Sequence, residues 1–209
     1  MNRLTKEDIL RYFEMINKAL AKRNQTGEII VAGGAALALA FDARNSTYDI
    51  DAIFEPKSDM QKIIKEVAQA NDLDDDWLND GVKGFMNNTM DATVCLNLSH
   101  LVVKNLDAKS LLAMKLTSAR PEPSMDMKDS IFLMEKLNIK AESELFAIIE
   151  KYTHPSRHTM QSKYFTKTAF EKYQRRKLSL CEQLEIGKQK VKEQDKRNPP
   201  RKSRDGYEW

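Results

Sequence analysis

Two aspartates separated by one residue, Asp49 and Asp51, are the side chains in this sequence best suited to chemistry. On an extended strand over residues 47–54, side chains alternate, so both carboxylates would lie on one face. Their negative charges repel each other unless a hard cation lies between them or a proton is shared. The spacing therefore indicates a Mg²⁺ site.

A glycine pair, Gly33-Gly34, lies just before these aspartates in the chain. Residues 28–32 form a short apolar, β-branched run that stops at the pair, and residues 35–41 are strong helix formers. This order predicts a strand, a tight turn and the start of a helix. Free N–H groups and the helix dipole would then attract an anion, and glycine lets a phosphate approach the backbone.

Neither pattern is specific by itself. A lone Gly-Gly is more often a plain turn, and a lone Asp-x-Asp is more often a solvated strand face. Both occur here within one strand, turn, helix and strand unit, with Arg44 and Ser46 between them. A nucleotide-transferring enzyme needs this combination, since amides hold the triphosphate and carboxylates hold the metal that bridges it.

Gly33-Gly34-Ala35, followed by Arg44, Ser46 and the two aspartates, resembles the signature of the minimal nucleotidyltransferases of the polymerase-β-like superfamily. The AbiEii and MenT type toxins are the nearest likeness, over roughly residues 8–137. The resemblance implies that Gly33, Gly34, Ala35, Arg44 and Ser46 bind the nucleotide and that Asp49 and Asp51 are catalytic metal ligands. The superfamily usually has serine where Ala35 stands, so one hydroxyl contact to phosphate is lost while the backbone amides remain.

Two later segments are similar to the same group. Residues 77–84 would place Asp80 and Lys83 at the edge of the nucleotide site, although the two side chains, one helical turn apart, could form only a local ion pair. Lys115 lies beside an apolar stripe on its predicted helix, and its residue type alone predicts a side chain that extends to solvent. The resemblance instead implies that Lys115 holds the triphosphate and that Asp129 or Asp126 helps to assemble the site.

Superfamily members usually carry a third carboxylate after the aspartate pair. The candidates here are Asp91 at the start of a strand, Asp107, whose position is also typical of a helix N-cap, and Asp126. If none of them fills that role, the base that activates the attacking hydroxyl comes from elsewhere or from the substrate.

Composition excludes several classes of protein. No apolar run is long enough to span a membrane, and the start of the chain lacks a secretion pattern, so we expect a cytoplasmic protein. Cys95 and Cys181 lie far apart without ligands nearby, which favours two buried thiols over a disulfide or a zinc site. Residues 1–100 hold 11 Lys and Arg against 16 Asp and Glu, and the remainder holds 23 against 15. The basic second half could face an anionic partner or only solvent.

The elements predict an α/β (α+β) fold with a small mixed sheet of about four strands flanked by helices. Thr5 would cap the first helix, and Ser58 with Gln61 would form a capping box for the second. Residues 77–86 read as a short helix or turn. We expect a nucleotidyltransferase core over residues 1–140, a helical C-terminal appendage over 141–194 and a basic, flexible tail over 195–209.

The predicted function is a Mg²⁺-dependent transfer of NMP from an NTP to a hydroxyl of RNA, such as tRNA, or of a protein, with release of pyrophosphate. One alternative is that this enzyme is a toxin neutralised by an antitoxin protein. Another is a non-catalytic nucleotide-binding or regulatory module, an alternative that the Ala35 departure and the lack of a clear third carboxylate leave open. The sequence leaves the acceptor, the preferred base and the oligomeric state open.

Overall fold

The computed structural model describes residues 3–85, 90–118 and 124–197. The chain divides into two compact units, Met1–Phe170 and Glu171–Trp209, each described here by itself. A long helix, α7 (Met160–Arg197), ends the first unit and forms the described part of the second. Helix was predicted for this region. Most of the tail predicted to be flexible, residues 198–209, lies outside the described residues, and the predicted domain boundary at residue 140 stays a prediction.

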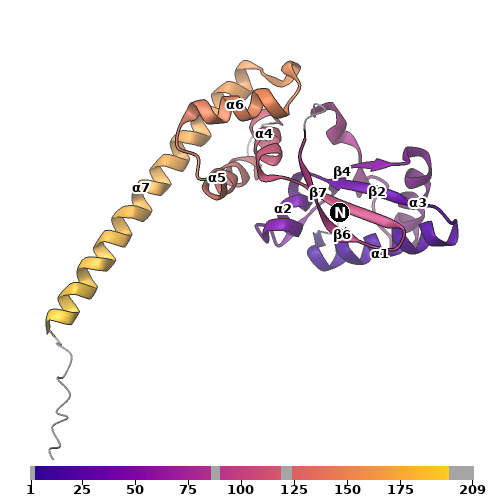
Figure 1. Cartoon of the computed structure of the whole chain (residues 1–209), viewed down its shortest axis with the longest axis horizontal. Helices are drawn as coiled ribbons and strands as arrows, with labels where there is room; N and C mark the ends of the chain where they lie inside the picture. Colours follow the sequence, from indigo (N-terminus) through magenta and orange to yellow (C-terminus); the bar gives the residue numbers. More distant parts are fainter. Residues whose placement is uncertain (1–2, 86–89, 119–123, 198–209) are drawn as a thin grey trace, which may run out of the picture. The chain divides into compact units, whose positions relative to one another are not determined.

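The centre of the first unit is a five-stranded mixed sheet (Figure 1). Its strands, in spatial order, are β5 (Leu78–Asn79), β4 (Ile50–Glu55), β2 (Gly27–Val31), β7 (Leu101–Leu106) and β6 (Ala92–Asn97). Strand β2 runs antiparallel to β4 and parallel to β7. A separate pair joins β1 (Leu4–Thr5) to β3 (Ser46–Thr47). The predicted mixed α/β fold is confirmed, and β5 adds one strand where a helix or turn was expected.

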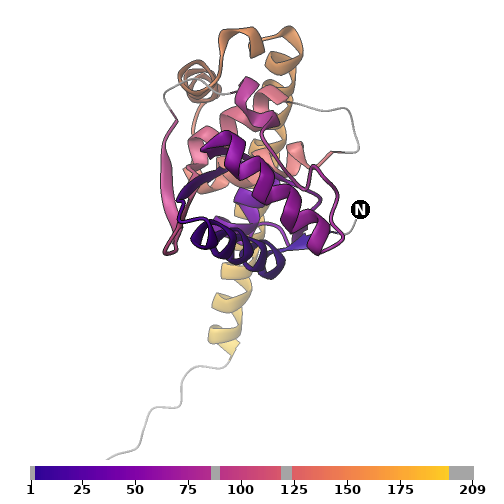
Figure 2. The same cartoon turned by 90° about the vertical axis from the view of Figure 1, so that its right-hand side faces the viewer.

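Two helices cover one face of this sheet. Helix α1 (Lys6–Lys22) and helix α3 (Lys57–Ala70) lie side by side against it (Figure 2). The strands bury alternate side chains, Ile29 and Val31 on β2 and Ala52 and Phe54 on β4. Burial of such apolar side chains contributes about 1.5–3 kcal/mol each for the larger ones. Because side chains alternate, Asp51 lies on the opposite, half-buried face.

The N-termini of α1 and α3 agree with one of the two capping predictions and contradict the other. Thr5 caps α1 as predicted, with Asp8 completing a capping box, and its hydroxyl accepts from the Asp8 N–H at 3.2 Å. The bonds from Thr5 hold the pKa of Asp8 below its ordinary value. The capping box at Ser58 is wrong: α3 begins at Lys57 with Pro56 as its N-cap, so Ser58 lies inside the first turn.

The helices that follow two neighbouring strands start at the same edge of the sheet. Helix α2 (Gly33–Phe41) follows β2, and helix α4 (Ala108–Ser118) follows β7, which is parallel to β2. The buried Asn105 amide joins strand β7 to helix α2 by donating to the Ala36 carbonyl at 3.2 Å. Helices α5 (Asp126–Leu137) and α6 (Glu142–Tyr152) pack against α4. This edge therefore gathers side chains that are distant in sequence.

The edge strand β6 differs from one expectation. Cys95, predicted to be a buried thiol, is exposed on this strand, because no residue of β6 is buried on either face of the sheet. The side chain of Cys181 lies outside the described residues. Across the described part of the chain, no helix has both the length and the apolar character that a bilayer span requires.

Candidate active site

The N-terminus of helix α2 lies directly against Asp51. The Ala32 N–H donates to the Asp51 carbonyl at 2.8 Å, which fixes the chain just before the helix. Gly33 then has a φ of +60°, and a Cβ built on it would lie 2.5 Å from the Asp51 Oδ2 atom. Only glycine allows both the left-handed backbone and this close approach. The glycine pair thus brings backbone amides to a carboxylate.

The N-terminus of α2 carries backbone groups of the kind that bind anions. In the described structure, the N-cap residue Ala32 makes no side-chain hydrogen bond to the first turn. The first N–H groups of a helix lack intrahelical partners and carry the positive end of the dipole. Ala35 is completely buried, so only its backbone could contribute to such a site.

Gly34 makes a second close approach, to the segment that follows α2. A Cβ on Gly34 would lie 2.7 Å from the Arg44 Nη1 atom and 2.8 Å from the Thr47 Oγ1 atom. Thr47 is buried, and Arg44 is mostly buried. Thr47 was not singled out from the sequence, since its role depends on where β3 places it.

Replacing Gly33 by alanine should destabilise the fold by about 2 kcal/mol, because the left-handed backbone and the contact with Asp51 both oppose a Cβ. This loss corresponds to a drop in melting temperature of about 4–8 °C. Gly84→Ala is the control, since among the described residues its Cβ would meet the flexible end of the Arg157 side chain, at 3.3 Å. Equal melting temperatures for the two variants would contradict the close packing on Asp51.

Asp49 and Asp51 line one polar hollow of about 530 Å³. Asp51 is on β4 as predicted, whereas Asp49 lies just before the strand, because the chain turns at Tyr48 after leaving β3. Among the described residues, no cation lies within ion-pair distance of the Asp49 carboxylate. The remaining residues that line this polar hollow are Arg3, Gly34, Ala43, Arg44, Asn45, Ser46, Thr47, Tyr48, Lys115, Ser124, Met125 and Asp126.

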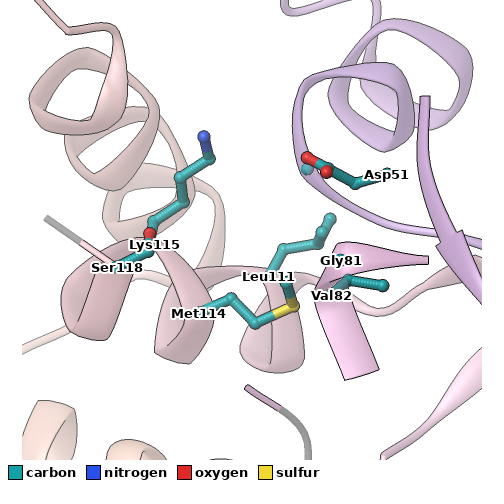
Figure 3. A pocket seen from close by; sticks show the side chains of 8 residues that line it. Asp51, Gly81, Val82, Leu111, Met114, Lys115 and Ser118 are labelled. Atoms are coloured by element: carbon teal, nitrogen blue, oxygen red, sulfur yellow. The ribbon is translucent and has the colours of Figure 1, made fainter. Parts of the chain in front are cut away.

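A second, apolar hollow of about 190 Å³ adjoins the first. Asp51 and Lys115 line both hollows. In Figure 3, Asp51 and Lys115 lie on opposite sides of the apolar hollow, and Leu111 and Met114 of α4 lie between them. This hollow was not predicted from the sequence, because its walls come from four separate segments of the chain.

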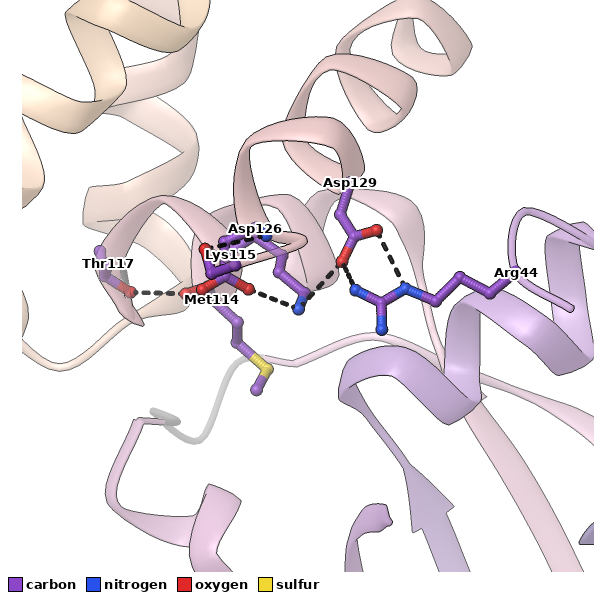
Figure 4. Close-up of polar contacts among 7 residues, drawn as sticks. Arg44, Met114, Lys115, Thr117, Asp126 and Asp129 are labelled. Atoms are coloured by element: carbon purple, nitrogen blue, oxygen red, sulfur yellow. Dashed lines mark hydrogen bonds and ion pairs between the residues drawn. The ribbon is translucent and has the colours of Figure 1, made fainter. Parts of the chain in front are cut away.

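Arg44, Lys115, Asp126 and Asp129 form a buried ion-pair cluster (Figure 4). Arg44 donates two hydrogen bonds to Asp129, one of them from Nε at 3.1 Å. Lys115 Nζ lies 2.8 Å from Asp126 Oδ1 and 3.0 Å from Asp129 Oδ2. Lys115 is only 8% exposed, so it does not extend to solvent as its residue type alone would favour. Asp129 therefore pairs with both Arg44 and Lys115, the two cations that the resemblance implies bind the nucleotide.

Asp80 and Lys83 belong to a surface group of charges. Their side chains form an ion pair at 3.9 Å, Lys57 contacts Asp80 at 2.7 Å, and Lys83 contacts Glu55 at 3.5 Å. The hydrogen bond from Lys57 holds the pKa of Asp80 below its ordinary value, against the opposing effect of burial. The local ion pair expected from the sequence is present. The role of both residues at the edge of a nucleotide site stays a prediction.

The three candidates for a further carboxylate have different surroundings. Asp91 accepts a hydrogen bond from the Tyr152 hydroxyl at 3.2 Å. Asp107 accepts from the Ser110 N–H at 2.7 Å, as its predicted capping position requires. Asp126 pairs with Lys115 and is the candidate that lines the polar hollow together with Asp49 and Asp51.

The start of helix α2 lies against the Asp51 carboxylate at the edge of a mixed α/β sheet, and Asp49 lines the same polar hollow. This is the arrangement expected of an enzyme that transfers nucleotides. Residues 7–178 match the model of a family described as a nucleotidyltransferase of unknown function (DUF6036). The match covers most of the chain, which therefore belongs to this family. No curated protein and no solved structure matches the chain. The finer likeness to the AbiEii and MenT type toxins stays a prediction.

Proposed function

We propose that this protein is a Mg²⁺-dependent nucleotidyltransferase that moves NMP from an NTP to a hydroxyl group and releases pyrophosphate. The observation that carries the proposal is the contact between Gly33 and Asp51, which places helix amides beside a carboxylate. The amides suit a triphosphate, and the carboxylate suits the cation that accompanies it. Membership in a nucleotidyltransferase family supports a nucleotide substrate.

Asp49 and Asp51 are the residues that would hold Mg²⁺. Among the described residues, no group of three or more side chains is placed to bind a metal ion by itself. Mg²⁺ commonly binds through one or two carboxylates together with waters and substrate phosphates, so two aspartates in a polar hollow fit it. When bound, the ion would neutralise phosphate charge and polarise the α-phosphate.

The chain's own groups would orient the two reactants. The first amides of α2, beginning at Gly33 and Gly34, would donate to phosphate oxygens, and Lys115 and Arg44 would add positive charge beside them. Asp129 and Asp126 limit how far these cations can move. The acceptor hydroxyl would attack the α-phosphate in line. Its oxygen would form the new P–O bond, its proton would pass to a base of the site or of the substrate, and the bond to the leaving pyrophosphate would break.

An RNA acceptor is favoured over a protein acceptor by the rim of the polar hollow. Tyr48 is 54% exposed there, and the Arg3 guanidinium lies 4.8 Å from its ring centre. Exposed aromatic rings next to arginine are suited to stack the bases of single-stranded RNA. A tRNA is one such acceptor, and modification of tRNA would fit a toxin controlled by an antitoxin protein.

A non-catalytic nucleotide-binding module is the second candidate. Lys115 is paired with two carboxylates, and Ala35 provides no hydroxyl at the helix start. A nucleotide bound under these conditions could be held without being transferred. Such a module would bind NTP and show no dependence on an acceptor.

The decisive test is incubation of the purified protein with each α-³²P-labelled NTP and Mg²⁺, with and without total tRNA. We expect label on RNA only when Mg²⁺ is present, and none after chelation by EDTA. Label on the protein instead would identify a protein acceptor. NTP binding without any labelled product, from either RNA or protein, would favour the non-catalytic module.

A further inference from the structure

The apolar hollow has walls suited to a flat, weakly polar group. Val82 from the 3₁₀ turn η1 (Gly81–Phe85) and Leu111 and Met114 from α4 supply apolar side chains. Gly33 and Gly81 contribute backbone atoms to its walls, and Ser118 contributes one hydroxyl at the end of α4. A planar heterocycle presents apolar faces and a polar edge, which matches this lining.

The hollow opens onto the residues proposed for the phosphate chemistry. Asp51 and Lys115 line it and also line the polar hollow (Figure 3). A ligand that occupied both hollows would therefore carry a polyanion next to a flat apolar group. A nucleoside triphosphate has this composition.

We propose that the apolar hollow between η1 and α4 binds the nucleobase of the NTP. This inference rests on the proposed function and assigns the base to one of the two hollows. The volume of about 190 Å³ is below the roughly 300–1,000 Å³ of sites that enclose a whole drug-sized ligand, which suits one heterocycle better than a complete nucleotide. The polar hollow, lined by five charged side chains besides Asp51, suits the phosphates and the acceptor better.

The test fills the apolar hollow and compares two probes by titration calorimetry in the presence of Mg²⁺. One probe is α,β-methylene ATP, which cannot be cleaved at the α-phosphate, and the other is inorganic tripolyphosphate, which lacks a base. Wild type should bind the ATP analogue about 10- to 100-fold more tightly, since burial of the base against Val82, Leu111 and Met114 adds affinity. Val82→Phe should remove most of this difference and leave the affinity for tripolyphosphate unchanged.

Val94→Phe is the matched control. It makes the same substitution on the edge strand β6, where Val94 is 57% exposed and lines neither hollow. Its affinities for both probes should equal those of wild type. Loss of tripolyphosphate binding by Val82→Phe would indicate that this variant has a disturbed fold. In that case Met114→Phe, which fills the hollow from the opposite wall, is used in its place.

Each outcome separates this inference from the proposed function. If wild type binds both probes equally, or if both filled variants keep the preference for the ATP analogue, the base does not bind in this hollow, although transfer could still occur. If wild type binds neither probe, both the inference and the proposed function are overturned. Loss of preference for the ATP analogue in the filled variants alone supports the base site.

Discussion

Replacing Asp51 by asparagine is expected to lower nucleotidyl transfer by at least about 10³-fold, which corresponds to a loss of about 4 kcal/mol of transition-state stabilisation. The amide keeps the size of the side chain, so the contact with Gly33 and the fold around it should persist. The negative charge is lost, and a neutral amide is a much weaker ligand for Mg²⁺ than a carboxylate. Transfer of α-labelled NMP and the melting temperature would be measured on the same preparation.

Asp42→Asn provides a control at the other end of helix α2. Asp42 caps this helix with a φ of 47°, a conformation that asparagine also accepts, and its side chain is largely exposed. The variant loses one exposed ion pair with Lys6 and should keep its activity. Asp51→Asn with activity equal to that of this control would remove Asp51 from the chemistry and with it the assignment of the site.

Much of the fold was predictable because its signals are local. The apolar run that became β2, the helix formers of α2 and the Thr5 cap all act within a few residues. Strand β5 was not predictable in this way, since two residues carry no periodicity and their conformation depends on pairing with β4. The same limit explains the error at Ser58, where the capping pattern fits the sequence but the helix and its N-cap lie two residues earlier.

Contacts in the site were likewise predictable where they are local in sequence and not where they depend on tertiary packing. Gly33 and Asp51 belong to one local unit, and the predicted order of strand, turn, helix and strand was enough to suggest that they meet. The pairing of Arg44 with Asp129 joins residues 85 positions apart, and nothing local sets how helix α5 approaches the segment after α2. For Lys115, residue type favoured solvent, whereas packing of α4 against α5 brings two carboxylates to its ammonium group.

Replacing Asp129 by asparagine should destabilise the protein by about 3 kcal/mol, which corresponds to about 6–12 °C in melting temperature. Asp129 is 5% exposed, accepts hydrogen bonds from Arg44 and forms an ion pair with Lys115. Its removal leaves two buried cations with the single carboxylate of Asp126. Leaving a buried charge without its partner costs more than the intact pair contributes, because the desolvation remains uncompensated. Thermal unfolding followed by circular dichroism would measure the loss.

The effect on transfer distinguishes two roles for Asp129. If it only neutralises charge, Asp129→Asn should bind tripolyphosphate more tightly, since Arg44 and Lys115 would face the phosphates with less competition. We expect the opposite, weaker binding and slower transfer, because the bonds to Asp129 fix where both cations lie. Glu135→Gln, an exposed change on the same helix, should shift neither stability nor binding beyond about 0.5 kcal/mol. A stable Asp129→Asn variant with tighter binding would mean that Asp129 restrains the phosphate site instead of assembling it.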